Sequence, residues 1–305
     1  MTISDQSAQI AAIAIQNDYI VATSAGCAYV FVKPSGGWAS EQEGAALTPS
    51  DPEPNNDFGV SAAAWGNTVV VGAPGYATET GKAYVYVEPS GGWVDATEDA
   101  HLTASDGAPY WQLGTSVAIT GPAGGGGNLI AVGAPQNYGT HTVRGGAVYV
   151  YDEPPGGWSS VMQTAELSPR EDRGAGFGSN VTIAPEIVVG GAPSYDVVWI
   201  FDEPSGGWTD SAQPSFALTQ PNQLDIGDRA SLTQNGEVLT VCCGRTSGKS
   251  EPLDLGFVWH ADQDWSTAIR LSAEGLTSSA GWCTSTHDWA FLADEYGNIF
   301  VFDGK

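Results

Sequence analysis

Basic residues are scarce in this chain of 305 residues, in which 10 lysines and arginines stand against 35 aspartates and glutamates. The net charge of −25 would repel nucleic-acid backbones and anionic membrane surfaces, so we expect neither as a partner. Long hydrophobic runs are missing too: the longest uncharged apolar run near the start, residues 8–16, is too short to cross a bilayer. No basic segment precedes it, so we recognise no signal peptide and expect a cytoplasmic protein; a secreted protein with a trimmed signal peptide is the alternative.

Cysteine is also rare in the chain. The four cysteines, Cys27, Cys242, Cys243 and Cys283, include no CxxC pair of the kind that binds zinc. We expect free thiols in a reducing compartment, and disulfides in a secreted protein are the alternative. The GxSxG, HExxH and Walker motifs are missing as well, which removes the common signatures of several hydrolases and of P-loop enzymes.

Turn-forming residues, by contrast, are abundant. The chain has 40 glycines and 18 prolines, and 10% of its residues are aromatic. This composition is typical of short strands joined by tight turns. Because 42% of the residues are hydrophobic and only 15% are charged, the chain can bury a core. An all-β fold is expected.

A turn sequence of the form PSGGW recurs along the chain. Its copies end at Trp38, Trp93, Trp158 and Trp208, and an eroded copy ends at Trp265. The spacing of 50 to 65 residues is typical of a propeller blade or another four-strand unit. An alternating segment such as CAYVFV or KAYVYV precedes each turn, and this alternation predicts a strand.

Each repeat divides into four predicted strands. In the second repeat the first strand is expected at 58–64, the second at 68–74 and the third at 83–87, with the fourth ending at Thr103. Six such units predict one domain, 1–305, that is a six-bladed β-propeller of four-stranded antiparallel blades. The blades are expected at about 8–50, 51–105, 106–169, 170–220, 221–272 and 273–305 plus 1–7. The last unit has only three strands of its own, so residues 2–7 are expected to close it.

The repeats resemble the FG-GAP repeat of integrin α-subunit propellers and their microbial relatives. Phe58-Gly59 is followed by Val71-Gly72-Ala73-Pro74, and the pattern returns at 113–114 with 132–135 and at 177–178 with 190–193. Many blades of that family carry a DxDxDG calcium loop between their first two strands. None of the corresponding loops here has three oxygen-bearing side chains at alternate positions. We therefore expect no metal and no cofactor.

Arginine is concentrated in the connections on one side of the predicted propeller. The loops from strand four to strand one and from strand two to strand three emerge on that side. They contain Arg144, Arg170, Arg173, Arg229 and Arg245, and they also contain Tyr76, Tyr110, Trp111, Tyr138, Tyr195 and Trp282. Family repeats often carry Asp-Arg before Phe-Gly, so Arg173 and Arg229 are interpreted as structural braces. Arg144, Arg170 and Arg245 are the candidate catalytic residues, because a guanidinium suits carboxylate, phosphate or carbonyl oxygens.

The other candidate ligand contacts on this side are Tyr110, Trp111, Tyr138, His141, Tyr195 and Trp282. His141 is included because it lies in an expanded loop, 136–144, whereas the other histidines have no such setting. The turn tryptophans invite a sugar-stacking interpretation, but a residue repeated at one position usually packs the same hairpin in every repeat.

Two functions remain. The loops differ from unit to unit while the scaffold repeats, which favours one asymmetric site near the axis for a small molecule with an apolar body and a polar oxygen. Such a monomer could be a cofactor-free cyclase or pericyclase of natural-product biosynthesis, of the hetero-Diels–Alderase kind, or a silent binder. The alternative is an extracellular carbohydrate-binding, lectin-like or adhesion module, which the sequon Asn180-Val181-Thr182 favours.

Overall fold

The computed structural model describes residues 2–5, 7–38, 42–122, 126–135, 145–169, 176–210, 212–219, 224–232, 238–245, 254–260, 269–272, 280–285, 289–294 and 299–303. In these ranges the chain forms six sheets and two short helical turns, α1 (Tyr76–Glu79) and the 3-10 turn η1 (Pro193–Tyr195). None of the described helices is long and apolar enough to cross a membrane. The prediction of an all-β fold is confirmed.

The sheets follow one another along the chain. The first contains β1 (Ala12–Ile15), β2 (Tyr19–Ser24), β3 (Cys27–Val32), β4 (Ala45–Thr48) and β8 (Ala96–Thr97). The second contains β5 (Ser61–Trp65), β6 (Thr68–Ala73), β7 (Lys82–Val87), β9 (Ala100–Thr103) and β13 (Val161–Met162). The third contains β10 (Ser116–Thr120), β11 (Leu129–Ala134), β12 (Ala147–Asp152) and β14 (Ala165–Leu167). The fourth contains β15 (Asn180–Ala184), β16 (Ile187–Ala192), β17 (Val197–Asp202) and β18 (Phe216–Thr219). The fifth contains β19 (Leu224–Leu232), β20 (Val238–Arg245), β21 (Asp254–His260) and β22 (Ile269–Ser272), and the sixth contains β23 (Ala280–Ser285), β24 (Trp289–Asp294) and β25 (Ile299–Asp303).

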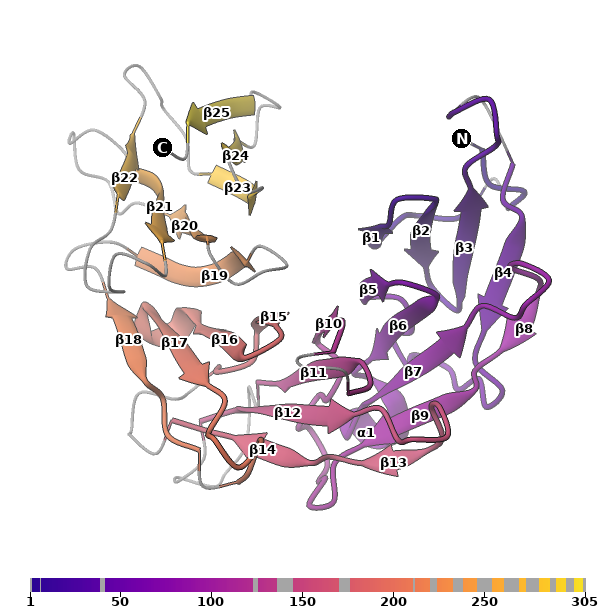
Figure 1. Ribbon diagram of the computed structural model, residues 1–305, viewed down its shortest axis with the longest axis horizontal. Helices are drawn as coiled ribbons and strands as arrows, with labels where there is room; N and C mark the ends of the chain where they lie inside the picture. The colour runs from indigo at the N-terminus through magenta and orange to yellow at the C-terminus, as the bar shows by residue number, and fades with distance from the viewer. Residues whose placement is uncertain are drawn as a thin grey trace.

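The sheets are arranged as an arc. Figure 1 shows β1, β5, β10 and β15 toward the centre of the arc, and β4, β14 and β18 along its outer rim. The N-terminus and the sixth sheet lie on opposite sides of an opening in the arc (Figure 1). Within each sheet, the strands that belong to one repeat pair antiparallel, as in Ser61↔Gly72 and Gly72↔Ala83 of the second sheet.

The hydrophobic core lies between successive sheets. One cluster joins Val70 and Val85 of the second sheet to Val117 and Ile119 of the third. The turn tryptophans belong to these clusters, and the prediction that they are structural is confirmed for Trp93, Trp158 and Trp208, which are buried. Trp38 departs from the prediction and is exposed; its repeat forms the first sheet, which borders the opening of the arc in Figure 1.

The glycines of the FG and GAP motifs bring neighbouring sheets into backbone contact. Gly114 of the third sheet has φ +97°, and a Cβ there would collide with the carbonyl oxygen of Lys82 in the second sheet. A Cβ on Gly72 would in turn collide with the carbonyl oxygen of Gly114. The Ser61 hydroxyl donates a 2.8 Å hydrogen bond to that same carbonyl. Glycine is needed at both positions because a side chain would push the sheets apart.

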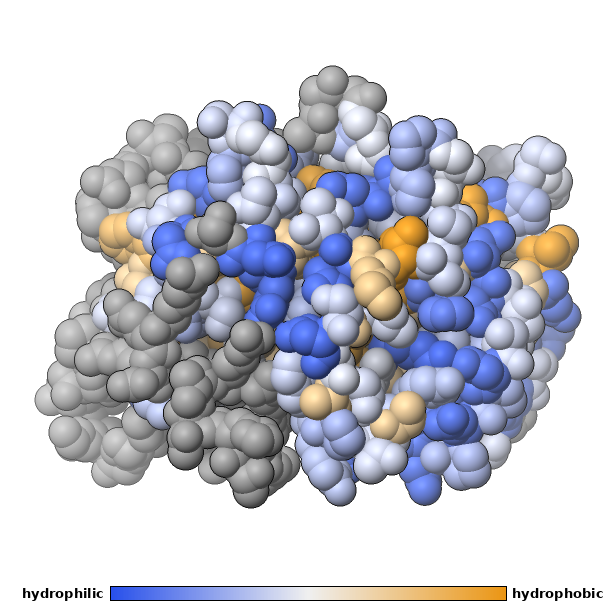
Figure 2. Space-filling view, turned by 90° about the horizontal axis from the view of Figure 1, so that it is seen from below, coloured by the Kyte–Doolittle hydropathy of each residue, from blue (hydrophilic) through white to orange (hydrophobic). Residues whose placement is uncertain are grey.

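Short parallel pairs connect the sheets at the outer rim. β8 leaves the second repeat to pair with β4 of the first sheet, as in Thr48↔Thr97. In the same way β13 of the third repeat pairs with β9, as in Met162↔Thr103. The face seen from below, in Figure 2, is mostly hydrophilic, with apolar residues as separate spots.

Two predictions of strand position differ from the structure. The first strand of the second repeat begins at Ser61 rather than at residue 58, because Gly59 at φ +95° keeps the Phe58-Gly59 pair in the preceding turn. The expected pairing of residues 2–7 with the last sheet is absent among the described strands. Instead, Thr2 forms a parallel bridge with Gln42 of the first repeat, and the sixth sheet has three strands.

Candidate functional site

The structure describes part of the face on which the sequence places a ligand. Arg144, Arg170, Tyr138 and His141 lie outside the described residues, as does the brace Arg173. Arg245 ends β20, where it is the register partner of Leu224, and Trp282 lies in β23 opposite Ala293. Tyr110, Trp111 and Tyr195 are described with their surroundings.

Tyr110 and Trp111 lie in the loop between β9 and β10. Tyr110 is half-exposed and has a left-handed backbone, φ +71°. Its amide donates a 3.2 Å hydrogen bond to the Thr78 carbonyl in the loop between β6 and β7. Trp111 is partly buried against the core between the second and third sheets. Tyr195 is also exposed and ends η1. It lies in the loop between β16 and β17 of the fourth sheet, which is equivalent to the loop between β6 and β7 of the second.

The loop between β6 and β7 has an unusual backbone. Three consecutive residues of α1, Ala77, Thr78 and Glu79, are left-handed, with φ between +49° and +62°. Each such non-glycine residue costs about 1–2 kcal/mol, and runs of them are rare. Only contacts from outside the turn can hold it in this conformation. We call residues 76–80 the left-handed turn.

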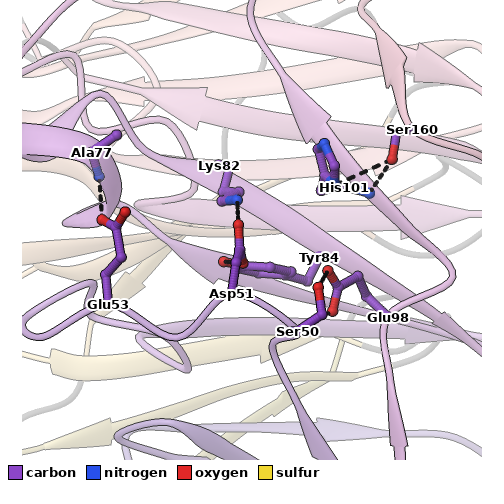
Figure 3. A network of polar contacts seen from close by, with 9 residues as sticks. All are labelled: Ser50, Asp51, Glu53, Ala77, Lys82, Tyr84, Glu98, His101 and Ser160. Atoms are coloured by element: carbon purple, nitrogen blue, oxygen red, sulfur yellow. Dashed lines mark hydrogen bonds and ion pairs between the residues drawn. The ribbon is translucent and has the colours of Figure 1, made fainter.

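Two neighbouring loops supply those contacts. From residues 104–115, the Gln112 amide donates to the Glu79 carbonyl at 2.7 Å, and the Gln112 side chain donates to the Glu79 carboxylate at 2.7 Å. From residues 50–57, the Glu53 carboxylate accepts a 3.1 Å hydrogen bond from the Ala77 amide (Figure 3). The left-handed turn is therefore clamped between the loops that enter the second and third sheets.

Backbone strain among the described residues is concentrated in these three loops. Seven of the eight described non-glycine residues with positive φ lie there: Asn55, Asp57, Ala77, Thr78, Glu79, Tyr110 and Gln112. The eighth, Asp196, follows η1 on the equivalent loop of the fourth sheet. Strained residues of this kind gather at ligand clamps and active sites.

A buried lysine lies beneath the left-handed turn. The Lys82 ammonium contacts an Asp51 carboxylate oxygen at 2.5 Å, and the hydroxyl of Tyr84 donates to the other oxygen at 2.8 Å (Figure 3). The ammonium also lies 3.4 Å from the ring centroid of Tyr76, the first residue of the turn, a cation–π geometry. The lysine thus ties the turn to the loop that enters the second sheet.

The charges in this cluster shift two pKa values. Burial alone would raise the pKa of the Asp51 carboxyl, but the hydrogen bonds from Lys82 and Tyr84 outweigh it and hold that pKa below its usual value. Burial, followed by the hydrogen bond to Asp51, raises the pKa of the Tyr84 hydroxyl. Asp51 is therefore a carboxylate at neutral pH. It accepts hydrogen bonds from Lys82 and Tyr84 and so holds both side chains in place.

Sequence reasoning missed Lys82, although the strands carried a signal for it. The aligned strands have Cys27, Ala147 and Val197 at this position, all uncharged. A lysine in such an alternating, buried strand needs a carboxylate partner. That partner is Asp51. It aligns with Asp106 of the next repeat, whose carboxylate accepts a 3.0 Å hydrogen bond from the Tyr149 hydroxyl.

The structure also describes the sequon and most of the possible metal ligands. The sequon residue Asn180 begins β15, and its side-chain oxygen accepts a 2.8 Å hydrogen bond from the Ala230 amide of the fifth sheet. Because this side chain links two sheets, the sequon no longer favours a glycosylated protein. Within the described ranges no group of three or more His, Cys, Asp or Glu side chains is arranged to hold a metal ion.

Comparisons with known proteins agree with this repeat architecture. Residues 42–86 and 96–151 match the FG-GAP repeat, so the resemblance seen in the sequence is confirmed there. No curated protein matches the chain. The crystal structure of the computationally designed Ika8 protein aligns with a TM-score of 0.57 at 15% identity, covering 97% of this chain and 71% of that chain. The structure of the Neurospora crassa Pan2 WD40 domain aligns with a TM-score of 0.58 at 15% identity, covering 98% and 77%. WD40 repeats form β-propellers, so the fold is that of a β-propeller module.

Proposed function

We propose that this protein is a small-molecule-binding β-propeller, with one asymmetric site on the face that carries the left-handed turn. The observation that carries the proposal is the concentration of strained residues in three loops clamped to one another by hydrogen bonds. A packed scaffold does not need such strain, whereas a preorganised ligand site does. The six sheets are proposed to form one closed ring, so that this face surrounds a single axis.

The chemistry of this face suits a ligand with an apolar body and a polar oxygen. The exposed ring of Tyr110 beside Trp111 offers apolar area next to fixed backbone groups. Arg144 and Arg170, from connections on the same side, and Arg245, which ends β20 rather than lying in the loop where the sequence placed it, are the proposed donors to the oxygen. Tyr138, His141, Tyr195 and Trp282 are proposed as further contacts. No cofactor is included in the proposal, and the protein is proposed to be a cytoplasmic monomer.

Should the bound molecule react, a cofactor-free cyclisation or cycloaddition of the hetero-Diels–Alderase kind is the reaction that such a face would support. The aromatic wall would fix the reacting geometry, and a guanidinium would stabilise charge that develops on the oxygen. Loss of one such donor typically lowers the rate by about two to three orders of magnitude. A non-catalytic binder would lose affinity instead.

The lectin-like alternative has lost two of its supports. Trp93, Trp158 and Trp208 are buried in the cores between sheets, so they cannot form a sugar-stacking platform. The side chain of the sequon residue Asn180 accepts a hydrogen bond from the neighbouring sheet. Among the side chains that the structure describes, the exposed aromatics left for a sugar are Trp38, Tyr110 and Tyr195, which belong to different repeats.

An alanine panel at Arg144, Arg170, Arg245, Tyr110, Trp111 and Tyr138 tests the proposal. Each folded variant is measured by calorimetry against an aromatic and terpenoid carbonyl library and against a simple-sugar array. The control is Met162→Ala, at an exposed apolar side chain of β13. Loss of small-molecule binding at two or more panel positions, with Met162→Ala unaffected, supports the site. Sugar binding that survives every substitution, with no small-molecule ligand found, would restore the lectin-like function.

A further inference from the structure

A tight turn precedes the inner strand of three successive sheets. The amide at the last position of each turn donates a hydrogen bond of 3.0 to 3.2 Å to the carbonyl at the first position. The pairs are Val60 with Asp57, Thr115 with Gln112, and Ser179 with Gly176. Val60, Thr115 and Ser179 therefore occupy one position of the repeat, directly before β5, β10 and β15.

The side chains at this position differ in kind. The Thr115 hydroxyl donates to the Gln112 carbonyl at 2.8 Å. The Ser179 hydroxyl donates to the Gly176 carbonyl at 2.7 Å. These second bonds strengthen the turn, as serine and threonine side chains commonly do. Val60 has the shape of threonine but no hydroxyl, and it is 44% exposed. The second repeat thus gives up a local hydrogen bond and presents methyl groups to solvent at the start of its inner strand.

Val60 is exposed because the connection beside it is short. The connection between β2 and β3 consists of residues 25–26, and the Gly26 amide donates a 3.4 Å hydrogen bond to the Phe58 carbonyl. The equivalent turn of the third repeat is covered instead by the left-handed turn, whose Glu79 carbonyl accepts a 2.7 Å hydrogen bond from the first residue of that repeat's turn. The methyl groups of Val60 are therefore accessible on the face that carries the left-handed turn.

The connection that carries Val60 is bonded to the left-handed turn. The Gly75 amide, directly before the left-handed turn, donates a 3.0 Å hydrogen bond to the Asn56 carbonyl. Within the left-handed turn, the Thr78 carbonyl accepts a 3.2 Å hydrogen bond from the amide of the exposed Tyr110. Val60 and Tyr110 thus belong to two connections that are both fixed to the same β6–β7 connection.

We propose that Val60 contacts the apolar body of the bound molecule and selects a hydrocarbon surface over a hydroxylated one. This inference rests on the proposed function, since it names the part of the ligand that lies at the second repeat of the same site. A ligand hydroxyl placed against the methyl groups would lose its hydrogen bonds to water without replacement, whereas a hydrocarbon gains by leaving water. The selected class is an aromatic or terpenoid skeleton with no hydroxyl on the side that faces Val60, and its polar oxygen points away from that side.

Titration with a naphthalene carboxylate, which combines an apolar body with a polar oxygen, tests this role on the whole chain. The valine methyl groups are labelled for NMR, and Val60→Thr identifies the Val60 signals by their loss. Those signals are expected to shift when the parent protein binds the probe. Calorimetry is expected to show an affinity lower by roughly tenfold for Val60→Thr, which is the scale for one apolar group in a binding pocket. The melting temperature should not fall, because the new hydroxyl can bond to the Asp57 carbonyl as its repeat equivalents do.

Val94→Thr is the matched control, because it makes the same exchange at a 53% exposed valine between β7 and β8. It is expected to leave the affinity unchanged. Equal affinities of Val60→Thr and the parent, with binding weakened in Tyr110→Ala, would overturn the role of Val60 and leave the proposed site standing. Probe binding that shifts other methyl signals but not those of Val60 would overturn it as well. Failure of the parent to bind the probe saturably would contradict the proposed function and this inference together.

Discussion

The second and third sheets share one link to the preceding sheet, and the second sheet adds a buried charge to it. In each, a tyrosine of the third strand donates to an aspartate that follows the outer strand of the preceding sheet: Tyr84 to Asp51 and Tyr149 to Asp106. The second sheet adds Lys82 to this bond, where the third has Ala147. The comparison shows that the repeat supplies a link between sheets, and that one departure from the repeat turns this link into a charged cluster under the left-handed turn.

The largest effect on stability is expected at Gly114, where the second and third sheets touch. Gly114→Ala should lower the free energy of unfolding by about 2–4 kcal/mol, because φ +97° is strained for alanine and a Cβ would collide with the second sheet. Gly92→Ala is the matched control: its φ is +92°, but no atom lies within 4 Å of a Cβ, so only the backbone cost of about 1–2 kcal/mol is expected. Urea unfolding followed by tryptophan fluorescence measures both, and equal losses would show that the close contact is unimportant.

Most of this scaffold could be read from the sequence. Alternating strands, the PSGGW turns and the FG-GAP glycines repeat, and repetition identifies residues that pack in the same way in every sheet. Trp38 is instructive, because its sequence matches the repeat while its exposure depends on a neighbouring sheet that local sequence does not encode.

The candidate site was less predictable. The unequal loops predicted a site on this face, and Tyr110 and Trp111 lie in one of the three strained loops. The left-handed conformation of Ala77, Thr78 and Glu79 could not be predicted, because none of these residues favours it. It exists only through contacts with two loops that lie up to 33 residues away in sequence, as between Thr80 and Leu113.

The next largest effect concerns the lysine that distinguishes the two sheets. Lys82→Ala makes this position in the second sheet resemble the third, and it should cost about 2 kcal/mol because a charged hydrogen bond and a cation–π contact are lost. Lys33→Ala, at an exposed lysine, should change stability by no more than about 0.5 kcal/mol. Thermal unfolding at neutral pH measures both variants. A loss no greater for Lys82 than for Lys33 would mean that the charged cluster adds nothing to the repeated link.

Asp51→Asn tests the same cluster through its pH dependence. The pKa of Asp51 is lowered in the folded protein, so its carboxylate stabilises the fold above the unfolded pKa of about 3.9. That contribution is lost as the pH falls through the lower, folded pKa. Because the Asp51 side chain is 41% exposed, solvent screens its interactions, and the variant should be no more than about 1 kcal/mol less stable than the parent at pH 7. The difference should shrink on acidification. Unfolding curves between pH 7 and pH 2 measure this, and the double variant with Lys82→Ala gives the coupling between the two side chains.

The smallest effect on stability is expected at a tyrosine position that the second and third sheets share. Tyr86 in β7 and Tyr151 in β12 occupy the same position, and both side chains are fully or almost fully buried. The Tyr151 hydroxyl donates to the Thr103 carbonyl at 3.0 Å, whereas the buried Tyr86 hydroxyl has no hydrogen-bond partner among the described residues.

Tyr151→Phe should therefore cost about 1 kcal/mol, since the Thr103 carbonyl loses its donor, while Tyr86→Phe should be neutral or slightly stabilising because it removes an unsatisfied polar group. Both substitutions delete one oxygen from equivalent aromatic rings, so the difference in the free energy of unfolding isolates the hydrogen bond. Equal losses for the two variants would mean that Tyr86 has a partner in solution, such as an ordered water molecule. The two sheets would then be alike at this position, and Lys82 would remain the buried charge that distinguishes the second sheet from the third.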